Sequence, residues 1–194
     1  NPANHVCINV ATYGPGGRFT MTDRGTSALR QTRDCLTVGP SSMRWQDGRL
    51  IIEINEISSP PLISRVRGRI TVTPTALTQV ELPLTPEGTH IWRPFGPTST
   101  IEVDLDAPGW QWQGHGYFDA NFGTRALEQD FRYWTWGRYP VRGGSTCFYD
   151  AVRMDGSSLA TAVHFDADGQ AQDIALPPKM AMRRSLWQVA RDTR

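Results

Sequence analysis

Apolar and polar residues alternate along much of this chain. The clearest example is segment 65–73, RVRGRITVT, in which valine and isoleucine alternate with arginine and threonine. Segment 101–106, IEVDLD, has the same pattern, and segment 50–57 is a run rich in β-branched residues. Side chains of a β-strand point alternately to its two faces, so these segments predict half-buried strands.

Turn signals separate the predicted strands. Asp-Gly pairs occur at positions 47–48, 155–156 and 168–169. Both residues tolerate the positive φ of a tight hairpin turn, so we predict three antiparallel hairpins at these pairs. Segments 27–36 and 180–192 are predicted to be helical from their composition alone, because neither has a clear capping residue.

Many short strands with turns at a spacing of about ten residues predict an all-β protein, either a sandwich or an up-and-down barrel. At 194 residues the chain can form one large domain or two small ones. The cluster PFGP at 94–97 is the best candidate for a boundary. We therefore predict one unit at 1–96 and a second at 97–194.

Composition and charge exclude several classes of protein. The net charge of +1 gives no strong field for a nucleic-acid partner. Three cysteines without a CxxC spacing fit a reducing compartment better than a disulfide scaffold or a zinc site. The sequence has no apolar run of membrane-spanning length, no signal peptide at its start, and no P-loop, GxSxG, HExxH or GxGxxG motif.

An unusual density of aromatic residues marks segment 110–121, WQWQGHGYFDAN. If it is a strand, one of its faces carries only polar or titratable side chains, namely Gln111, Gln113, His115, Tyr117, Asp119 and Asn121. Its other face begins with Trp110 and Trp112. Such a strand either faces water or lines a polar pocket, and the aromatic residues favour the pocket.

Two pairs of residues at i and i+2 have the chemistry for proton transfer. They are His90 with Trp92 and Tyr117 with Asp119, and each pair shares a face if its segment is extended. A buried carboxyl keeps its proton because burial disfavours the charged form, and it can then serve as an acid. The alternatives are that Asp119 only opens a turn and that the others are core residues. His115 competes with His90 for the same task.

Two further groups have open alternatives. Trp134, Trp136 and Arg138 share a face and form either a wall for a long apolar ligand or a core stripe that ends in an arginine. Asp104 and Asp106 could be the acid and base of a glycosidase, but alternating charges ahead of a Pro-Gly turn are more typical of a solvated strand face.

Six motifs, in order along nearly the whole chain, carry a resemblance to a known family. They are NHVCINVATYG, RWQDGRLIIEINE, RVRGRI, THIWRPFGP, GHGYFDANFG and YWTWGRY. Together they resemble the carotenoid 1,2-hydratases, also called hydroxyneurosporene synthases. The resemblance implies two lipocalin-like antiparallel β-barrels, of which the first lacks its N-terminal part in this chain.

The resemblance also implies an activity and its residues. The family adds water across the terminal C1–C2 double bond of acyclic carotenoids such as neurosporene and lycopene, through a tertiary carbocation and without a metal or other cofactor. Its proposed catalytic residues correspond to His90, Trp92, Tyr117 and Asp119. Candidates for binding the long substrate are the aromatic and imidazole side chains Trp110, Trp112, His115, Trp134 and Trp136.

A hydratase of this kind must reach a substrate that is dissolved in lipid. The resemblance therefore implies peripheral contact with membrane lipid at the cytoplasmic face of the inner, photosynthetic membrane, and no nucleic-acid partner. A second class of function, a non-catalytic lipocalin-like carrier of apolar ligands, is compatible with the same barrel. A glycan-active enzyme that uses Asp104 and Asp106 is the third and least favoured class.

Overall fold

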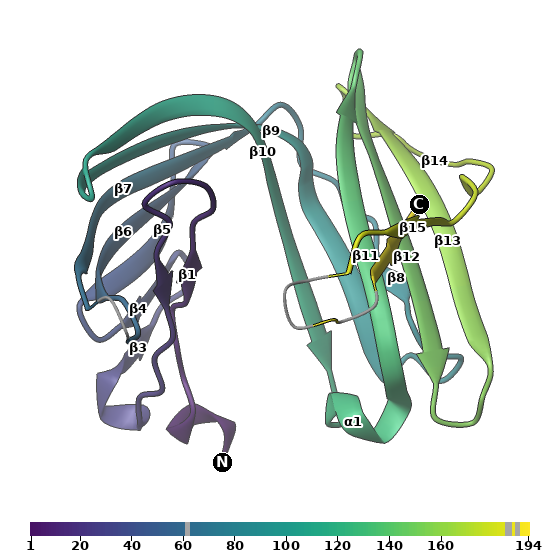
Figure 1. Cartoon of the computed structure of the whole chain (residues 1–194), viewed down its shortest axis with the longest axis horizontal. Coiled ribbons are helices and arrows are strands. Elements are labelled where there is room, and N and C mark those ends of the chain that lie inside the picture. Colours follow the sequence, from purple (N-terminus) through teal and green to yellow (C-terminus); the bar gives the residue numbers. More distant parts are fainter. Residues whose placement is uncertain (61–62, 185–187, 189–190) are drawn as a thin grey trace. The chain divides into compact units, whose positions relative to one another are not determined.

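The computed structural model describes residues 1–60, 63–184, 188 and 191–194, and it confirms an all-β chain (Figure 1). The first half contains the 3₁₀ turns Pro2–Asn4 and Thr26–Ala28 and the strands β1 Val10–Ala11, β2 Phe19–Thr20, β3 Leu29–Gln31, β4 Cys35–Val38, β5 Ser41–Gln46, β6 Arg49–Ile57, β7 Arg65–Pro74 and β8 Leu82–Pro83. The second half contains the long strands β9 His90–Ala107 and β10 Trp110–Gly123, the helix α1 Leu127–Asp130, and the strands β11 Phe131–Val141, β12 Gly144–Arg153, β13 Ser158–Asp166, β14 Ala171–Asp173, β15 Met180–Met182 and β16 Arg191–Thr193.

The chain packs as two units whose segments are interleaved in sequence. Unit 1 comprises Asn1–Thr73 and Thr100–Gly116, and unit 2 comprises Pro74–Ser99 and Tyr117–Arg194. Strands β9 and β10 each contribute residues to both units, so the single boundary near residue 96 that the sequence suggested does not describe this division. The identity of the units as closed lipocalin-like barrels stays a prediction.

Unit 1 is built on antiparallel neighbours. Strands β3 to β7 follow one another in the sheet, and β9 and then β10 continue it beyond β7. The alternation predicted for 65–73 and 101–106 is confirmed, because Val66, Val72 and Leu105 are buried in the core. That core also includes Val10, Ile54 and Val103.

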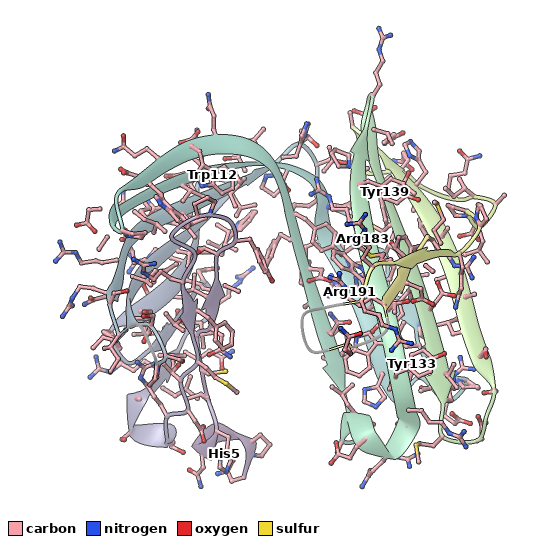
Figure 2. All side chains as sticks on the ribbon, in the orientation of Figure 1. His5, Trp112, Tyr133, Tyr139, Arg183 and Arg191 are labelled. Carbon is pink, nitrogen blue, oxygen red and sulfur yellow. The ribbon has the colours of Figure 1, made fainter. Side chains whose placement is uncertain are left out.

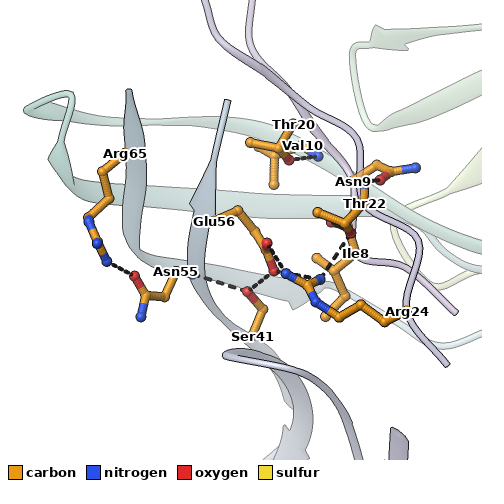
Figure 3. Close-up of polar contacts among 10 residues, drawn as sticks. All are labelled: Ile8, Asn9, Val10, Thr20, Thr22, Arg24, Ser41, Asn55, Glu56 and Arg65. Carbon is orange, nitrogen blue, oxygen red and sulfur yellow. Dashed lines mark hydrogen bonds and ion pairs between the residues drawn. The ribbon is translucent and has the colours of Figure 1, made fainter. Parts of the chain in front are cut away.

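A buried carboxylate is fixed inside unit 1 (Figure 3). Glu56 is 2% exposed, and its Oε2 lies 2.6 Å from Nη2 of Arg24. The hydroxyl of Ser41 donates to Glu56 Oε1 at 2.6 Å and also accepts the backbone N–H of Asn55. A buried charge needs such a partner and satisfied hydrogen bonds, so this group holds the N-terminal segment against β5 and β6.

Unit 2 contains the sheet β11-β12-β13-β14 and the parts of β9 and β10 that belong to it. Strand β12 is its most buried element, with Gly144 to Ala151 all buried. Its core packs Trp92 and Phe131 with Cys147, Tyr149 and Phe165. Strand β9 carries two of the residues that the sequence singled out for catalysis, His90 and Trp92, and Trp92 packs in this core with residues of β12.

The local predictions have mixed outcomes. The three hairpins are confirmed, because Asp-Gly pairs connect β5 to β6, β12 to β13 and β13 to β14, and each glycine has a positive φ. The predicted helix at 27–36 is wrong, since this segment forms β3 and β4 after a short 3₁₀ turn. The predicted helix at 180–192 is wrong where it is described, because its two ends pair as β15 and β16. Residues 185–187 and 189–190 lie outside the described residues.

Candidate functional site

Three of the four predicted catalytic side chains form one hydrogen-bonded group in unit 2. The indole N–H of Trp92 donates to Oδ2 of Asp119 at 2.9 Å and lies 3.0 Å from the hydroxyl oxygen of Tyr117. The Tyr117 hydroxyl donates to the same Oδ2 at 3.0 Å. Both donors use one carboxyl oxygen, so a proton on Asp119 is left to the other oxygen, Oδ1.

The position of these side chains follows from the strand period. Trp92 lies on β9, and Tyr117 and Asp119 lie on β10, its neighbour in the sheet. Because Tyr117 and Asp119 are two residues apart, they point to the same face, toward the indole. Trp92 is fully buried, and the ring of Tyr149 packs against it with centroids 5.8 Å apart.

Burial sets the protonation of this group. Burial raises the pKa of Asp119, while the hydrogen bonds from Tyr117 and Trp92 act in the opposite direction. Burial also raises the pKa of Tyr117, as does the neighbouring Asp119 charge. Cys147 lies close by, and burial raises the pKa of its thiol to about 12. The group therefore places a carboxyl with a raised pKa beside a phenol and a thiol whose pKa values are also raised.

His90 is buried at the start of β9 and contacts a carboxylate that the sequence did not single out. Its Nε2 lies 3.0 Å from Oδ2 of Asp130, at the end of α1. The ring packs edge-on against Phe131, with centroids 5.1 Å apart. A Cβ added to Gly123 would lie only 2.6 Å from His90 Nδ1, so the absence of a side chain there leaves room for the ring.

A small cavity adjoins His90 in unit 2. It has a volume of about 280 Å³, and its lining includes Leu84, His90, Asn121, Gly123, Trp134 and Tyr149. Asn121 follows Asp119 by two residues on β10 and shares its face. The cavity is near the lower limit for ligand pockets, so it suits one end of a long molecule better than the whole.

The predicted substrate-binding tryptophans divide between the two units. Trp110 and Trp112 line a larger cavity of about 620 Å³ in unit 1, whose other walls include Val10, Ile70, Val103 and Leu105. In unit 2, Trp134 lines the cavity beside His90, and Trp136 packs on the ring of Tyr117 with centroids 4.9 Å apart. Unit 1 thus has two tryptophans beside its cavity. Unit 2 has one tryptophan beside its cavity and one against the Asp119 group.

His115 differs from the other predicted site residues. Its side chain is exposed, and the residue belongs to unit 1, whereas Tyr117 and Asp119 belong to unit 2. The period of two along β10 therefore does not bring His115 into the Trp92–Tyr117–Asp119 group. Of the two candidate bases, His90 is the one that belongs to the same unit as that group.

The alternative catalytic candidates have structural contacts of their own. Asp106 pairs with Arg67 on the exposed face, and this pair lowers the pKa of the Asp106 carboxyl. Asp104, also exposed, accepts a hydrogen bond from Gln111. Neither carboxylate is held in a dry site, as a glycosidase acid requires. Within the described part of the chain, no group of three or more His, Cys, Asp or Glu residues is arranged to hold a metal ion.

Sequence reasoning missed Asp130 and Asn121 as members of the site. Asp130 is separated from His90 by 40 positions and lies in a four-residue helix, so no local pattern connects them. Asn121 lies on the polar face of segment 110–121, and its spacing of two residues from Asp119 is the signal that could have predicted its place in the site.

Comparison with known proteins identifies the family. The family "Carotenoid hydratase CrtC" matches residues 1–194. The acyclic carotenoid 1,2-hydratase of Cereibacter sphaeroides is 64% identical over 192 residues, which cover 99% of this chain and 68% of that protein. The enzyme of the same name from Rhodobacter capsulatus is 53% identical over 194 residues, covering 100% of this chain and 69% of that protein.

A more distant relative gives the same result. The acyclic carotenoid 1,2-hydratase of Thiocapsa roseopersicina is 42% identical over 195 residues, which cover 100% of this chain and 48% of that protein. No solved structure matches this chain at a significant level. Because the family match covers every residue and these relatives align along essentially the whole chain, the chain belongs to the carotenoid hydratase family.

Proposed function

We propose that this chain hydrates acyclic carotenoids, as the names of its relatives state for those proteins. Such an enzyme is a hydro-lyase that adds water across the terminal C1–C2 double bond and gives a 1-hydroxy-1,2-dihydro end group. The observation that carries the proposal is the buried Asp119 carboxyl, which accepts hydrogen bonds from Trp92 and Tyr117 on a single oxygen.

Asp119 is the general acid in this proposal. Its raised pKa favours the protonated form, and the two donors on Oδ2 leave the proton on Oδ1. Transfer of this proton to C2 turns the double bond into a C2–H bond and leaves a tertiary cation at C1. The new Asp119 carboxylate is stabilised by the donors that are already in place, so they need not reorganise during the step.

Water then completes the addition. The oxygen of one water molecule forms a bond to C1, and His90 accepts the proton that this water loses. That proton returns to Asp119 through solvent, so the net reaction adds one water and consumes no cofactor. Trp92 contributes to this mechanism in two ways. Its indole face attracts the cation by about 0.5 to 2 kcal/mol. Its N–H orients the Asp119 carboxyl.

The cavities support a substrate that inserts one end. The space beside His90, about 280 Å³, fits the branched terminus of a polyene, and Trp134 and Trp136 supply aromatic walls in the same unit. Trp110 and Trp112 are candidates for carotenoid binding in the separate apolar cavity of unit 1. His115, which is exposed, is the weakest of the predicted substrate contacts.

We also propose that the protein acts as a peripheral protein at the cytoplasmic face of the photosynthetic membrane. In the described part of the chain, no helix has the length and apolar character that a membrane crossing requires. Unit 2 exposes the side chains of Tyr133 and Met180. It also carries Arg183 and Arg191, which Figure 2 labels together with Tyr133. Exposed apolar and cationic side chains suit an interface with anionic lipid. Sedimentation with anionic vesicles, but much less with neutral ones, is the expected result.

Product analysis of one variant tests the hydratase. Wild-type protein and Asp119→Asn protein are incubated with lycopene or neurosporene in lipid vesicles, in water enriched in heavy oxygen. We expect a labelled tertiary alcohol from the wild type and at least a hundredfold less from the variant. The variant should fold at least as well as the wild type at neutral pH, because burial disfavours the charged carboxylate that it removes.

The apolar cavity of unit 1 favours one alternative, a carrier of apolar ligands. Its lining includes Val10, Val103 and Leu105 together with two tryptophans, and it lies in the unit without the Asp119 group. Unchanged carotenoid that co-purifies equally with wild-type and Asp119→Asn protein would support the carrier and exclude the hydratase.

A further inference from the structure

A carboxylate outside the predicted catalytic group lies against the proposed base. His90 and Asp130 are both largely buried, with side-chain exposures of 6% and 11%, and Nε2 of His90 is 3.0 Å from Oδ2 of Asp130. The ring N–H does not point straight at the carboxylate, and no better-aligned hydrogen-bond partner reaches this nitrogen among the described residues. Among the described residues, Asp130 is the carboxylate that lies within ion-pair distance of this nitrogen.

Asp130 is itself held from several sides. The hydroxyl of Thr89 donates to its Oδ2 at 3.0 Å, and Nη1 of Arg125 lies 3.0 Å from its Oδ1. Its backbone carbonyl accepts the N–H of Met154 at 2.9 Å. An arginine and a hydroxyl both donate hydrogen bonds to carboxylate oxygens, so these contacts fix the position of Asp130 beside the ring.

The Nδ1 edge of the His90 ring, opposite Asp130, lies toward the cavity of unit 2. Gly123 lies beside Nδ1 and Cε1 of His90, where a Cβ would meet them at 2.6 and 3.0 Å, and both residues line the cavity of about 280 Å³. A carboxylate at one nitrogen attracts the proton to that nitrogen and leaves the lone pair on the other. In this arrangement Nε2 carries the proton toward Asp130, and Nδ1 is left as the basic atom.

We propose that Asp130 is a positioning residue for the hydration reaction, which holds His90 in the tautomer and orientation in which Nδ1 accepts the proton of the attacking water. This inference rests on the proposed function, because it concerns the residue to which that function gives the role of base. Asp130 itself touches no reacting atom and acts only through His90.

The test uses Asp130→Asn and the longer carboxylate Asp130→Glu, with Asp150→Asn as a matched control. Asp150 is another buried aspartate of unit 2 that pairs with an arginine, Arg194, and it has no contact with His90. Each protein is assayed for hydration of vesicle-borne lycopene. Thermal melting selects a temperature at which all the variants are folded.

A second readout follows the His90 ring itself. The chain has four histidines, so His90→Gln identifies the His90 signals in nuclear magnetic resonance spectra of the ring nitrogens, which report the tautomer. The charged or titratable groups around this ring are Asp130, Arg125 and Tyr149, with Arg153 bonded to the nearby Leu84 carbonyl. Of these, only Asp130 is changed in the test variant.

The proposal predicts a joint result. Asp130→Asn should lower kcat by about 10- to 100-fold with carotenoid retention unchanged, Asp130→Glu should recover part of it, and Asp150→Asn should keep the wild-type kcat. The ¹⁵N signals of the His90 ring should indicate the Nε2-protonated tautomer in wild type and a different tautomer balance in Asp130→Asn, because the carboxylate that favours a proton on Nε2 is gone.

Other results overturn the inference. Full kcat in Asp130→Asn contradicts it, and so does a loss of kcat with unchanged His90 ring signals, since that loss would be structural. An inactive wild type instead means that the proposed function has failed. In that case unchanged ring signals also remove the contact between His90 and Asp130, whereas changed signals keep the contact and remove its catalytic role.

Discussion

At the scale of single residues, burial and hydrogen bonding shift the pKa of Asp119 in opposite directions. Burial raises the pKa of the Asp119 carboxyl, and the hydroxyl of Tyr117 and the indole of Trp92 stabilise its charged form. A general acid needs both effects, because it must hold a proton before the reaction and carry a negative charge after it. Tyr117 and Trp92 therefore have a role beyond core packing in the proposed mechanism.

The opposing effects give a prediction of pH dependence. In the proposed mechanism Asp119 must be protonated, so activity should fall as the pH rises through the raised pKa of that group. Tyr117→Phe removes a donor that lowers this pKa, so the alkaline fall should move to higher pH, although the poorer orientation of the acid should reduce the maximal rate about tenfold. Profiles of kcat against pH measure both effects.

A control for this variant lies in the same unit. Tyr139→Phe removes a phenol that packs on Phe148 and has no contact with Asp119, so its pH profile should match that of the wild type. An alkaline fall that moved to lower pH in Tyr117→Phe would contradict the assigned direction of the hydrogen bond.

Residue spacing predicted the hydrogen-bonded group of Trp92, Tyr117 and Asp119 but not its surroundings. The i, i+2 pairs could be predicted because a strand fixes which side chains share a face, and Trp92, Tyr117 and Asp119 meet accordingly. The same rule failed for His115, because β10 passes from unit 1 to unit 2 after Gly116. Asp130 could not be predicted, since only tertiary packing brings α1 to the start of β9.

At the scale of elements, the end of β10 is shaped by a glycine. Gly123 lies so close to His90 that a Cβ would meet Nδ1 at 2.6 Å and the carbonyl oxygen of Thr89 at 2.6 Å. Atoms at these distances must shift, and the Thr89 carbonyl is held in place because it accepts the N–H of Thr124 at 3.0 Å. Gly114 on the same strand has ordinary contact distances, of which the shortest is 3.7 Å to Trp112.

The two glycines make a matched pair of substitutions. Gly123→Ala should reduce kcat at least tenfold, because it displaces the ring of the proposed base, whereas Gly114→Ala should leave kcat unchanged. Both proteins are measured for lycopene hydration and for thermal stability. Equal activity of the two variants would show that the position of His90 is not critical.

An ion pair with the Asp150 carboxylate anchors the C-terminal hairpin of β15 and β16. Nε and Nη2 of Arg194, just after β16, donate to the two oxygens of Asp150 on β12 at 2.6 and 2.8 Å. Arg194 lowers the pKa of the Asp150 carboxyl, and Lys179 contributes in the same direction. A lowered pKa stabilises the fold above the unfolded-state pKa of the group, and this stabilisation is lost as the pH falls through the folded-state pKa.

Arg194→Met should therefore destabilise the protein by about 1 kcal/mol at neutral pH, and the difference from wild type should disappear in acid. Urea unfolding at several pH values between 3 and 7 measures this difference. Arg67→Met is the control, because the exposed pair of Arg67 with Asp106 should have no measurable effect on stability. A difference that persists unchanged in acid would mean that Arg194 acts through packing alone.

At the scale of the whole molecule, the chain separates an apolar cavity from the acid group. The cavity with Trp110 and Trp112 belongs to unit 1, and the Asp119 group belongs to unit 2. The all-β class could be predicted because alternation and Asp-Gly turns are local signals. The division into interleaved units could not, since β9 and β10 are each continuous strands that serve two cores.

This separation predicts that binding and chemistry respond to different substitutions. Trp112 lines the unit 1 cavity and is 51% exposed, so Trp112→Ala should leave the fold intact and remove apolar contact with the carotenoid. We expect KM to rise about tenfold with kcat nearly unchanged, because an indole that contacts only the bound chain stabilises ground and transition states equally. Phe19→Ala is the control, since Phe19 is in the same unit and 52% exposed but does not line the cavity. A fall in kcat at unchanged KM would instead mean that unit 1 takes part in the chemical step, and the division of roles between the units would have to be abandoned.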